Sequence, residues 1–235
     1  MNPRDVVHEV CGQTLQLMPE RSVFWREKNI LLAADLHLGK EGTFRSAGIP
    51  LPEGPSVETL DRLDQALARS GAIRLVVLGD LFHGTSSVDA FAEVMEAWRC
   101  RWPDLGIELI GGSHDRWSGD LPESWRIELY NEPRRMDPFE LRHYPAVSAG
   151  GNYWLAGHLH PGVVLKEGKR GATLRLPCFY FSEQGGILPA FGSFTGVIGV
   201  EPDPGSHCYA VAGHEVVRIP SSTNQLNYRK MKRGS

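Results

Sequence analysis

Apolar residues in the first half of the chain fall into short continuous runs, separated by segments with a helical repeat. Continuous runs of about four to eight apolar residues are typical of strands that are buried in a sheet. The runs that predict such strands are residues 21–25, 29–34, 73–80 and 106–112.

The segments between these strands predict two helices, over residues 51–71 and 86–102. Prolines precede the first helix and Gly71 follows it, which is the usual punctuation of helix ends. The apolar positions that share a face of the first helix are Val57, Leu60, Leu63 and Leu67. Those of the second helix are Val88, Phe91, Val94, Met95 and Trp98. Alternating strands and helices predict parallel strands that are joined by right-handed crossovers.

The pattern changes after about residue 138, where short β-rich pieces are interrupted by glycine and proline. The pieces that predict strands are residues 139–145, 152–158, 162–168, 173–181, 195–200, 207–213 and 214–220. An α/β half followed by a β-dominated half predicts two facing mixed β-sheets that are flanked by helices.

Length and composition fit one soluble globular domain over residues 1–235, with 41% hydrophobic and 23% charged residues. A net charge of −3 gives no global electrostatic case for nucleic-acid binding, although a local basic face is still open. The segment YRKMKR places four cations near the end, and we expect residues 221–235 to be a basic, solvated tail.

Cysteine usage and the absence of long apolar runs predict a cytoplasmic protein with no membrane contact. The cysteines stand far apart without a CxxC pair, as is typical of reduced thiols, at Cys11, Cys100, Cys178 and Cys208. Neither a secretory h-region nor a run of transmembrane length occurs in the sequence.

Candidate metal ligands follow several of the predicted strands. LAADLHLGKE places Asp35 and His37 two positions apart, so in an extended segment both side chains point the same way. The next strand ends in LVVLGDLFHG, with Asp80 and His83. The third is followed by GGSHDRW (111–117), and WLAGHLHPG contributes two more histidines later. The carboxyl ends of parallel strands are where such sheets place their functional sites.

The positions of the histidines are the sharpest part of this pattern. Five of the nine, at 37, 83, 114, 158 and 160, fall within these strand-end segments. Taken alone, Asp-x-His after a strand more often belongs to a turn than to a metal site, and GHLH could be a buried polar turn. Four such strand ends together favour a metal site. Carboxylate and imidazole ligands suit manganese, iron or zinc rather than calcium, and no cysteine ligand supports a structural zinc site.

The motifs DLH, GDLFHG, HD and GHLHP resemble, in this order, those of the calcineurin-like metallophosphoesterase superfamily. The segments ADLHLGKE, GGSHDR, LPCF and LPAFGSFTG resemble more narrowly its ligase-associated DNA damage-response endonuclease (PdeM-type) branch. The resemblance covers about residues 10–220. It implies a four-layer α/β/β/α sandwich and two divalent metal ions, with Mn²⁺ favoured over Fe²⁺ or Zn²⁺.

The resemblance also implies a set of metal ligands. One ion would be bound by Asp35, His37 and His160, and Asp80 would bridge both ions. The second ion would be bound by His158 and by His143, which is the histidine between residues 115 and 157. The alternative for His143 is a surface loop residue.

Ser113 departs from the family pattern, in which an asparagine supplies an amide ligand to the second ion. A serine hydroxyl is closer to the backbone than that amide oxygen, so we expect Ser113 to bind through a water or to draw the site together. The sequence therefore predicts a weakened second metal site. A tolerated natural variant and an engineered change are both open.

The expected mechanism is attack on phosphorus by a hydroxide that bridges two cations, because such ions lower the pKa of bound water to near neutrality. His114, held by Asp115, is the expected general acid for the leaving oxygen. His83 matches a transition-state histidine of the nuclease branches, or it only orients Asp80.

A DNA substrate requires cations around the metal cleft. The best candidates adjoin the metal motifs and are Lys40, Arg45 and Arg116. Single-stranded or flapped DNA is favoured as substrate, with a repair helicase or ligase as a possible partner from the resemblance. The alternatives are a small-molecule or nucleotide phosphoesterase of the same superfamily, and a scaffold whose activity is weakened by Ser113.

Overall fold

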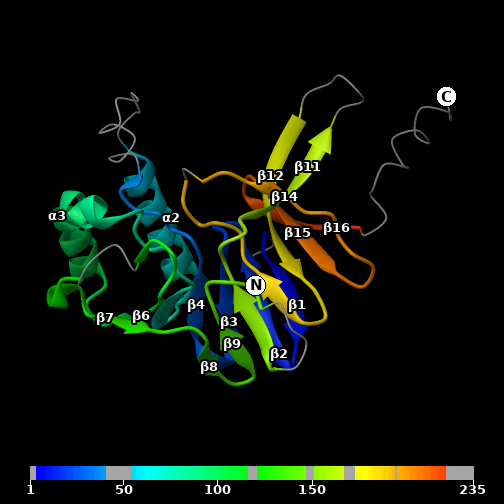
Figure 1. The fold of residues 1–235 in the computed structure, drawn as a ribbon, viewed down its shortest axis with the longest axis horizontal. Coiled ribbons are helices and arrows are strands. Elements are labelled where there is room, and N and C mark those ends of the chain that lie inside the picture. Colours follow the sequence, from blue (N-terminus) through cyan, green and yellow to red (C-terminus); the bar gives the residue numbers. More distant parts are fainter. Residues whose placement is uncertain are drawn as a thin grey trace.

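Two mixed β-sheets lie face to face in the computed structural model of the chain, with helices on one side (Figure 1). The structure describes residues 4–40, 54–115, 121–146, 151–166, 173–193 and 195–220. The prediction of two facing mixed sheets is confirmed. Among the described residues α-helices flank only the first sheet, so the outer helical layer implied on the second sheet is not seen there (Figure 1).

The first sheet has seven strands in the order of the chain, from β1 to β7. Its strands are β1 (Val6–Val10), β2 (Gln13–Met18), β3 (Ser22–Trp25), β4 (Ile30–Ala33), β5 (Arg74–Val77), β6 (Gly106–Ile110) and β7 (Ile127–Tyr130). The strands from β1 to β4 pair antiparallel, and those from β4 to β7 pair parallel. The predicted parallel arrangement is therefore confirmed.

Two α-helices cover one face of this sheet, α2 (Pro55–Ser70) and α3 (Thr85–Arg101). Their buried side chains, Leu63 and Trp98 among them, pack with Leu31 and Ala33 of β4. The prediction for Val57 was wrong, because this side chain is 47% exposed in the first turn of α2. In the part of the chain that the structure describes, both α-helices lie on this face. Two short 3₁₀ helices complete the set, η1 (Arg26–Lys28) and η3 (Glu123–Trp125).

The second sheet has nine strands and forms the other half of the sandwich. Its strands are β8 (Arg134–Met136), β9 (Phe139–Leu141), β10 (Tyr153–Ala156), β11 (Pro161–Lys166), β12 (Thr173–Phe181), β13 (Gly185–Ile187), β14 (Ile198–Gly199), β15 (His207–Ala212) and β16 (Glu215–Ile219). Each predicted β-rich piece contains one of these strands.

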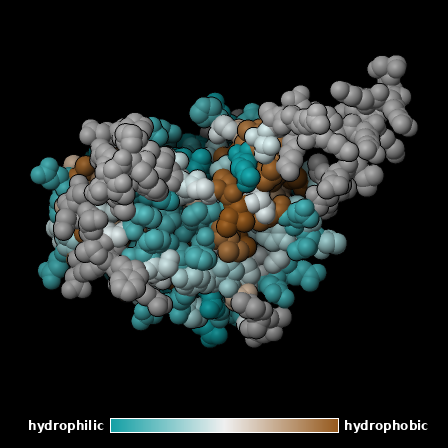
Figure 2. All heavy atoms as spheres, turned by 45° about the horizontal axis from the view of Figure 1, so that its top comes forward, coloured by the Kyte–Doolittle hydropathy of each residue, from teal (hydrophilic) through white to brown (hydrophobic). Residues whose placement is uncertain are grey.

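The core between the sheets follows from the alternation of side chains along each strand. Leu32 and Ala34 point away from the helices and pack with Leu155, Phe179 and other residues of the second sheet. The face shown in Figure 2 is mostly hydrophilic, with one compact hydrophobic patch. No helix among the described residues is long and apolar enough to cross a membrane.

Candidate metal centre

The ends of strands from both sheets meet at one edge of the sandwich. The amide of Asp35, after β4, donates to the carbonyl of Gly79, after β5, at 3.1 Å. The amide of His37 donates to the carbonyl of Asp80 at 2.9 Å. From the second sheet, the amide of His158 donates to Oδ2 of Asp35 at 2.8 Å. These bonds fix the motifs after β4, β5 and β10 against one another.

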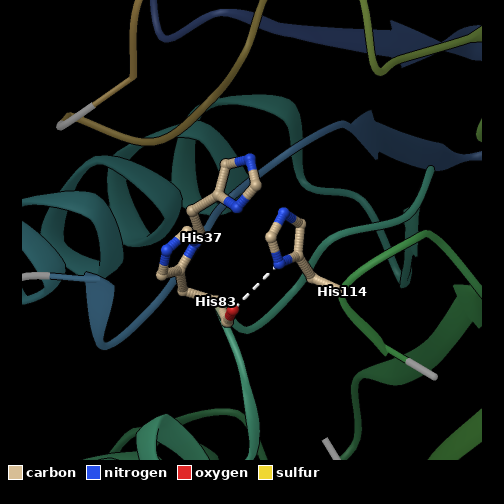
Figure 3. Close-up of side chains that lie close together, drawn as sticks. All are labelled: His37, His83 and His114. Atoms are coloured by element: carbon tan, nitrogen blue, oxygen red, sulfur yellow. Dashed lines mark hydrogen bonds between the residues drawn. The ribbon is translucent and has the colours of Figure 1, made fainter. Parts of the chain in front are cut away.

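Three histidines from three loops gather at this edge, His37, His83 and His114 (Figure 3). The rings of His83 and His114 are stacked with centroids 4.8 Å apart. Nδ1 of His114 lies 2.9 Å from the carbonyl oxygen of His83. A carbonyl only accepts, so Nδ1 of His114 carries the proton and Nε2 is left to face the carboxylate of Asp80, 4.0 Å away.

The first predicted set of ligands, Asp35, His37 and His160, has its donor atoms within 4.8 Å of one another. Oδ1 of Asp35 lies 3.6 Å from Nε2 of His160. This oxygen is buried and accepts no hydrogen bond from the described residues. A buried carboxylate oxygen without a partner is costly, and a cation at this point would compensate it. The donors therefore fit a divalent metal ion.

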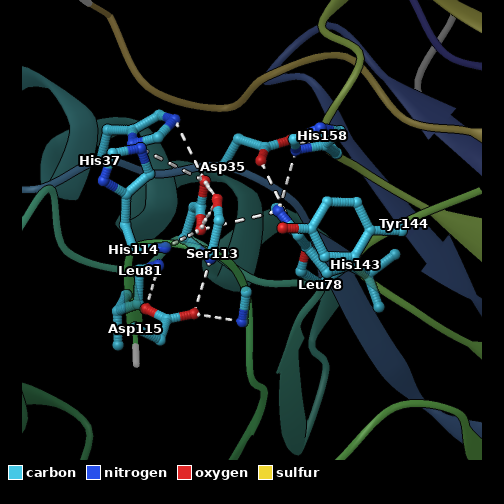
Figure 4. Close-up of polar contacts among 12 residues, drawn as sticks. Asp35, His37, Leu78, Leu81, Ser113, His114, Asp115, His143, Tyr144 and His158 are labelled. Atoms are coloured by element: carbon cyan, nitrogen blue, oxygen red, sulfur yellow. Dashed lines mark hydrogen bonds and ion pairs between the residues drawn. The ribbon is translucent and has the colours of Figure 1, made fainter. Parts of the chain in front are cut away.

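The second predicted set is Asp80, His143 and His158, whose donor atoms meet the same criterion. Nδ1 of His143 lies 3.1 Å from the carbonyl oxygen of Leu78, so this nitrogen donates and Nε2 carries the lone pair. Nε2 faces Oδ1 of Asp80 at 3.6 Å and Nδ1 of His158 at 3.1 Å. Figure 4 shows His143 and His158 side by side. His143 is fully buried, so it is not a surface loop residue.

Asp80 lies between the two sets. Its Oδ2 is 3.9 Å from Nε2 of His37, and its Oδ1 faces the second set. The carboxylate is almost completely buried, and the amide of His114 donates to Oδ1 at 2.9 Å. This position suits a carboxylate that is shared by two cations.

Three imidazoles of this centre, those of His37, His83 and His158, have a lowered pKa, which favours the neutral form that binds metal. Burial, followed by the positive charge of Lys40, lowers the pKa of His37 to about 2. Burial, followed by the neighbouring His143, lowers the pKa of His158. Burial also lowers the pKa of His83 to about 4, with Lys40 as the second cause. A neutral imidazole presents a lone pair, so these shifts suit ligation.

The backbone of the centre is unusual for residues other than glycine. Five predicted ligands have a positive φ, between 46° and 68°: Asp35, His37, Asp80, His158 and His160. Side chains disfavour this region, and such residues concentrate at functional sites. Two glycines make room for the ligands. A Cβ on Gly79 would lie 2.1 Å from Nδ1 of His143, and one on Gly112 would lie 2.4 Å from Oδ1 of Asp80.

Ser113 lies beside the centre, with its hydroxyl directed at Asp80. Oγ is 3.3 Å from Oδ1 and 3.2 Å from Oδ2 of this carboxylate. The serine therefore donates to the shared carboxylate in this structure. Its binding of a metal ion stays a prediction.

Asp115 has a different role from the predicted support of His114. Its Oδ2 accepts the amides of Asp80 at 2.7 Å and Gly112 at 2.8 Å, and its Oδ1 accepts the amide of Leu81 at 3.0 Å. Figure 4 shows these bonds around Asp115. This carboxylate therefore ties the loop after β6 to the loop after β5. The pattern His-Asp suggested a pair because the two residues are adjacent, whereas their side chains face different partners.

Glu132 also supports the centre, although no motif in the sequence points to it. Its Oε2 accepts the amides of His143 at 2.9 Å and Tyr144 at 3.1 Å. The ring of Tyr144 contacts that of His158, with centroids 4.5 Å apart. A glutamate in a loop resembles any surface acid, because only the fold brings it to these amides.

The predicted DNA-binding residues are described only in part. Lys40 lies next to the centre. Burial lowers the pKa of its ammonium, and the carboxylate of Asp80 opposes this shift only in part. Arg45 and Arg116 lie outside the described residues. The basic tail over residues 221–235 also lies outside them.

A search of solved structures finds a nuclease, MPE from Pseudomonas putida, with 38% sequence identity to this chain and a TM-score of 0.79. The match covers 92% of this chain and 100% of that chain. YfcE, a phosphoesterase from E. coli, shares 16% identity over 81% of this chain and 97% of its own, with a TM-score of 0.37. No family model and no curated protein matches the sequence.

The identity to the P. putida nuclease extends over nearly the whole chain, and the fold is shared. The two ligand sets stand at the strand ends where the motifs predicted them. The chain belongs to the calcineurin-like metallophosphoesterase superfamily, in its ligase-associated DNA endonuclease branch.

Proposed function

We propose that this chain hydrolyses phosphodiester bonds of single-stranded DNA as an endonuclease in DNA repair, with two Mn²⁺ ions. The observation that carries the proposal is the pair of ligand sets on either side of one shared carboxylate. Asp35, His37 and His160 would hold one ion, and His143 and His158 the other, with Asp80 between them. Oxygen and imidazole donors of this kind suit manganese.

Two bound divalent cations supply a water nucleophile at neutral pH and neutralise charge on the phosphoryl oxygens. The protein fixes the donors in advance. Leu78 sets the tautomer of His143, and Glu132 and Asp115 hold the loops that carry the ligands. Removal of such supporting hydrogen bonds typically lowers metal affinity or activity by about 10- to 100-fold.

In this proposal His114 protonates the leaving oxygen. Its side chain is 39% exposed, so it reaches the open side of the centre, whereas Asp80 is almost completely buried. The carbonyl of His83 orients the ring through Nδ1, so Nε2 is the atom that exchanges a proton with the substrate. His83 stacks on this ring, so a second imidazole lies beside the proposed general acid.

The nuclease MPE of P. putida supports nucleic acid as the substrate class. Lys40 lies beside the imidazoles, where its ammonium is suited to a phosphate of the bound strand. A flexible single strand delivers a phosphate into such a site more readily than a duplex does. A cytoplasmic location, with free thiols at the described cysteines, and recruitment by a repair helicase or ligase belong to the same proposal.

The test is cleavage of circular single-stranded DNA with and without added Mn²⁺, for the wild type and Asp80→Ala. A circle has no ends, so its cutting reports endonuclease action directly. We expect manganese-dependent cutting by the wild type and none by Asp80→Ala. An intact circle together with hydrolysis of a chromogenic diester would contradict the DNA assignment and favour a small-molecule phosphoesterase. Inactivity on both substrates would favour a scaffold.

A further inference from the structure

A groove separate from the metal centre lies along α2 and has a volume of about 930 Å³. Its walls come from the β2–β3 turn, one face of α2, the start of β12 and the β15–β16 turn. These segments belong to both halves of the molecule (Figure 1). A volume of about 300–1,000 Å³ is typical of ligand sites in proteins. None of the candidate metal ligands lines the groove.

Arginines are the main polar lining of this groove. They are Arg4, Arg21, Arg62, Arg69 and Arg175. Arg69 is neutralised, because it forms ion pairs with Asp5 and Glu20. Two further acids of the lining, Glu58 and Asp61, are exposed on α2. The lining therefore holds more arginines than acidic residues, and the groove keeps a net positive charge.

The guanidinium groups of Arg21 and Arg62 are neighbours, and both residues are half-buried. Arg21 donates through Nη1 to the carbonyl of Gly192 at 3.1 Å. Arg62 donates to the hydroxyl of Ser193 and lies over the ring of Phe191, 5.3 Å from its centroid. Among the described residues, no carboxylate forms an ion pair with either arginine, and the buried Nε of Arg62 has no acceptor.

Two half-buried like charges side by side attract an anion. Burial, followed by the charge of Arg21, lowers the pKa of Arg62 to about 10, and the more distant carboxylates of Glu58 and Glu20 oppose this shift only in part. Each guanidinium still has donors that the described contacts do not use. Arginine pairs of this kind match the oxygens of a phosphate group, which accept two parallel hydrogen bonds.

The groove also adjoins the metal centre through the segment that holds both arginines. The amide of Gly192 donates to the carbonyl of Asp35 at 3.1 Å, and Ser193 lines the groove. A strand that leaves the centre across Gly192 and Ser193 therefore enters the groove at Arg21 and Arg62.

We propose that Arg21 and Arg62 bind the phosphodiester backbone of the DNA strand on one side of the scissile bond. This inference rests on the proposed function and adds the path of the substrate to it. The arginines would contact phosphate groups and not bases, so the groove contributes affinity and orientation for a single strand of any sequence.

The test compares the wild type with Arg21→Gln/Arg62→Gln in binding a fluorescent phosphorothioate oligonucleotide, with Mn²⁺ bound and over a range of salt concentrations. We expect the affinity of the double variant to fall about tenfold and its salt slope to fall by about 1.4, because each lost phosphate contact changes the slope by about 0.7. The ratio of turnover on DNA to turnover on a chromogenic diester is expected to fall as well.

Arg101→Gln is the matched control, because Arg101 is half-exposed, pairs with Asp64 and does not line the groove. Its affinity and slope are expected to equal those of the wild type. If the glutamine pair does not fold, Arg21→Lys/Arg62→Lys keeps the charges but loses the paired donors. We then expect weaker binding with an unchanged slope.

Equal binding and equal slopes for the double variant and the wild type would overturn this inference and leave the proposed function standing. A wild type that neither binds nor cuts DNA would instead overturn the proposed function. Inorganic phosphate distinguishes the source of the anion. Competition only at millimolar concentrations supports the strand backbone, whereas displacement of DNA at micromolar concentrations would assign the groove to free phosphate.

Discussion

Ser113 stands where the family resemblance implies an asparagine ligand. Its hydroxyl donates to both oxygens of Asp80, whereas an asparagine there would present a carbonyl oxygen further from the backbone. The serine thus contacts the shared carboxylate, and we expect the second ligand set to have one donor fewer. The strand ends still bring together Asp80, His143 and His158.

Replacement of Ser113 by asparagine is expected to strengthen the second site. Ser113→Asn adds an amide oxygen, so we predict that the Mn²⁺ concentration for half-maximal diester hydrolysis falls about tenfold. Ser113→Ala removes the hydroxyl without adding a ligand, and serves as the control. An unchanged requirement for Mn²⁺ in Ser113→Asn would show that this position does not contact the metal site.

Removal of His114 is expected to have an effect that depends on the leaving group. His114→Ala removes the proton donor, so we predict a loss of about 10²- to 10⁴-fold on DNA. A p-nitrophenyl diester has a leaving group that needs no proton, and its hydrolysis is expected to fall much less. Parallel rate measurements on both substrates check this. Equal losses would contradict a role as general acid.

The residue types at the strand ends made a metal site predictable, whereas the division into two ligand sets and the inclusion of His143 came from the family resemblance. Carboxylate and imidazole at a spacing of two, after apolar runs, are informative because strand ends meet at one sheet edge. The contacts of Asp115 and Glu132 were not predictable, because each accepts amides of residues that are distant in the chain. Partners at such separations are set by the fold and leave no local pattern.

At the scale of elements, the loop after β6 brings Gly112 against the shared carboxylate. A Cβ here would lie 2.4 Å from Oδ1 and 2.6 Å from the amide nitrogen of Asp80. The neighbouring Gly111 has no contact of this kind, since the nearest atoms to its Cβ would be 3.8 Å away. The two glycines therefore differ in what surrounds them, although they are adjacent.

Gly112→Ala is accordingly expected to displace Asp80 and disrupt metal binding. We predict at least a tenfold loss of diester hydrolysis and a loss of about 1–3 kcal/mol in the free energy of unfolding, which is typical of overpacking. Gly111→Ala is the matched control and is expected to retain both. Isothermal titration with Mn²⁺ and urea unfolding measure the two effects. Similar behaviour of the two variants would contradict the crowding at Gly112.

Periodicity predicted the central elements well and the first two strands poorly. The apolar runs of β4, β5 and β6 and the helical repeats of α2 and α3 agree with the structure to within a few residues at each end. Strands β1 and β2 contain His8, Gln13 and Gln16, which interrupt the apolar pattern. β1 is an edge strand with little buried surface, so its apolar signal is weak. β2 lies between β1 and β3 and is mostly buried, and its glutamines obscure the pattern instead.

At the scale of the whole molecule, His8 connects the two sheets. It lies on β1, is 8% exposed, stacks on Phe181 and has Nδ1 3.1 Å from the hydroxyl of Tyr209. Burial, followed by the charges of His207 and Arg218, lowers the pKa of His8 to about 4 from an ordinary value of 6.5.

This shift predicts a loss of stability in mild acid. Below pH 6.5 the unfolded chain binds a proton at His8, whereas the folded protein does so only near pH 4. The stability that neutral His8 contributes is therefore complete above pH 6.5 and is lost as the pH falls toward 4. We predict that the urea midpoint falls less between pH 7.5 and 5 in His8→Phe than in the wild type. Equal changes in both proteins would contradict the shift.

The pairing of the sheets was predictable only as an architecture. The change to short β-rich pieces after about residue 138 indicates a second sheet. It does not indicate that β12 pairs with both β11 and β15. Likewise, the groove with Arg21 and Arg62 combines segments from both halves of the chain. Such arrangements depend on the order of the strands, which apolar patterns do not encode.

The most direct test of a two-metal centre is anomalous diffraction at the manganese edge from crystals soaked in Mn²⁺. We predict two peaks on either side of Asp80, one contacted by Asp35, His37 and His160 and the other by His143 and His158. A single peak, or a peak among His37, His83 and His114 in place of either, would contradict the two-metal assignment.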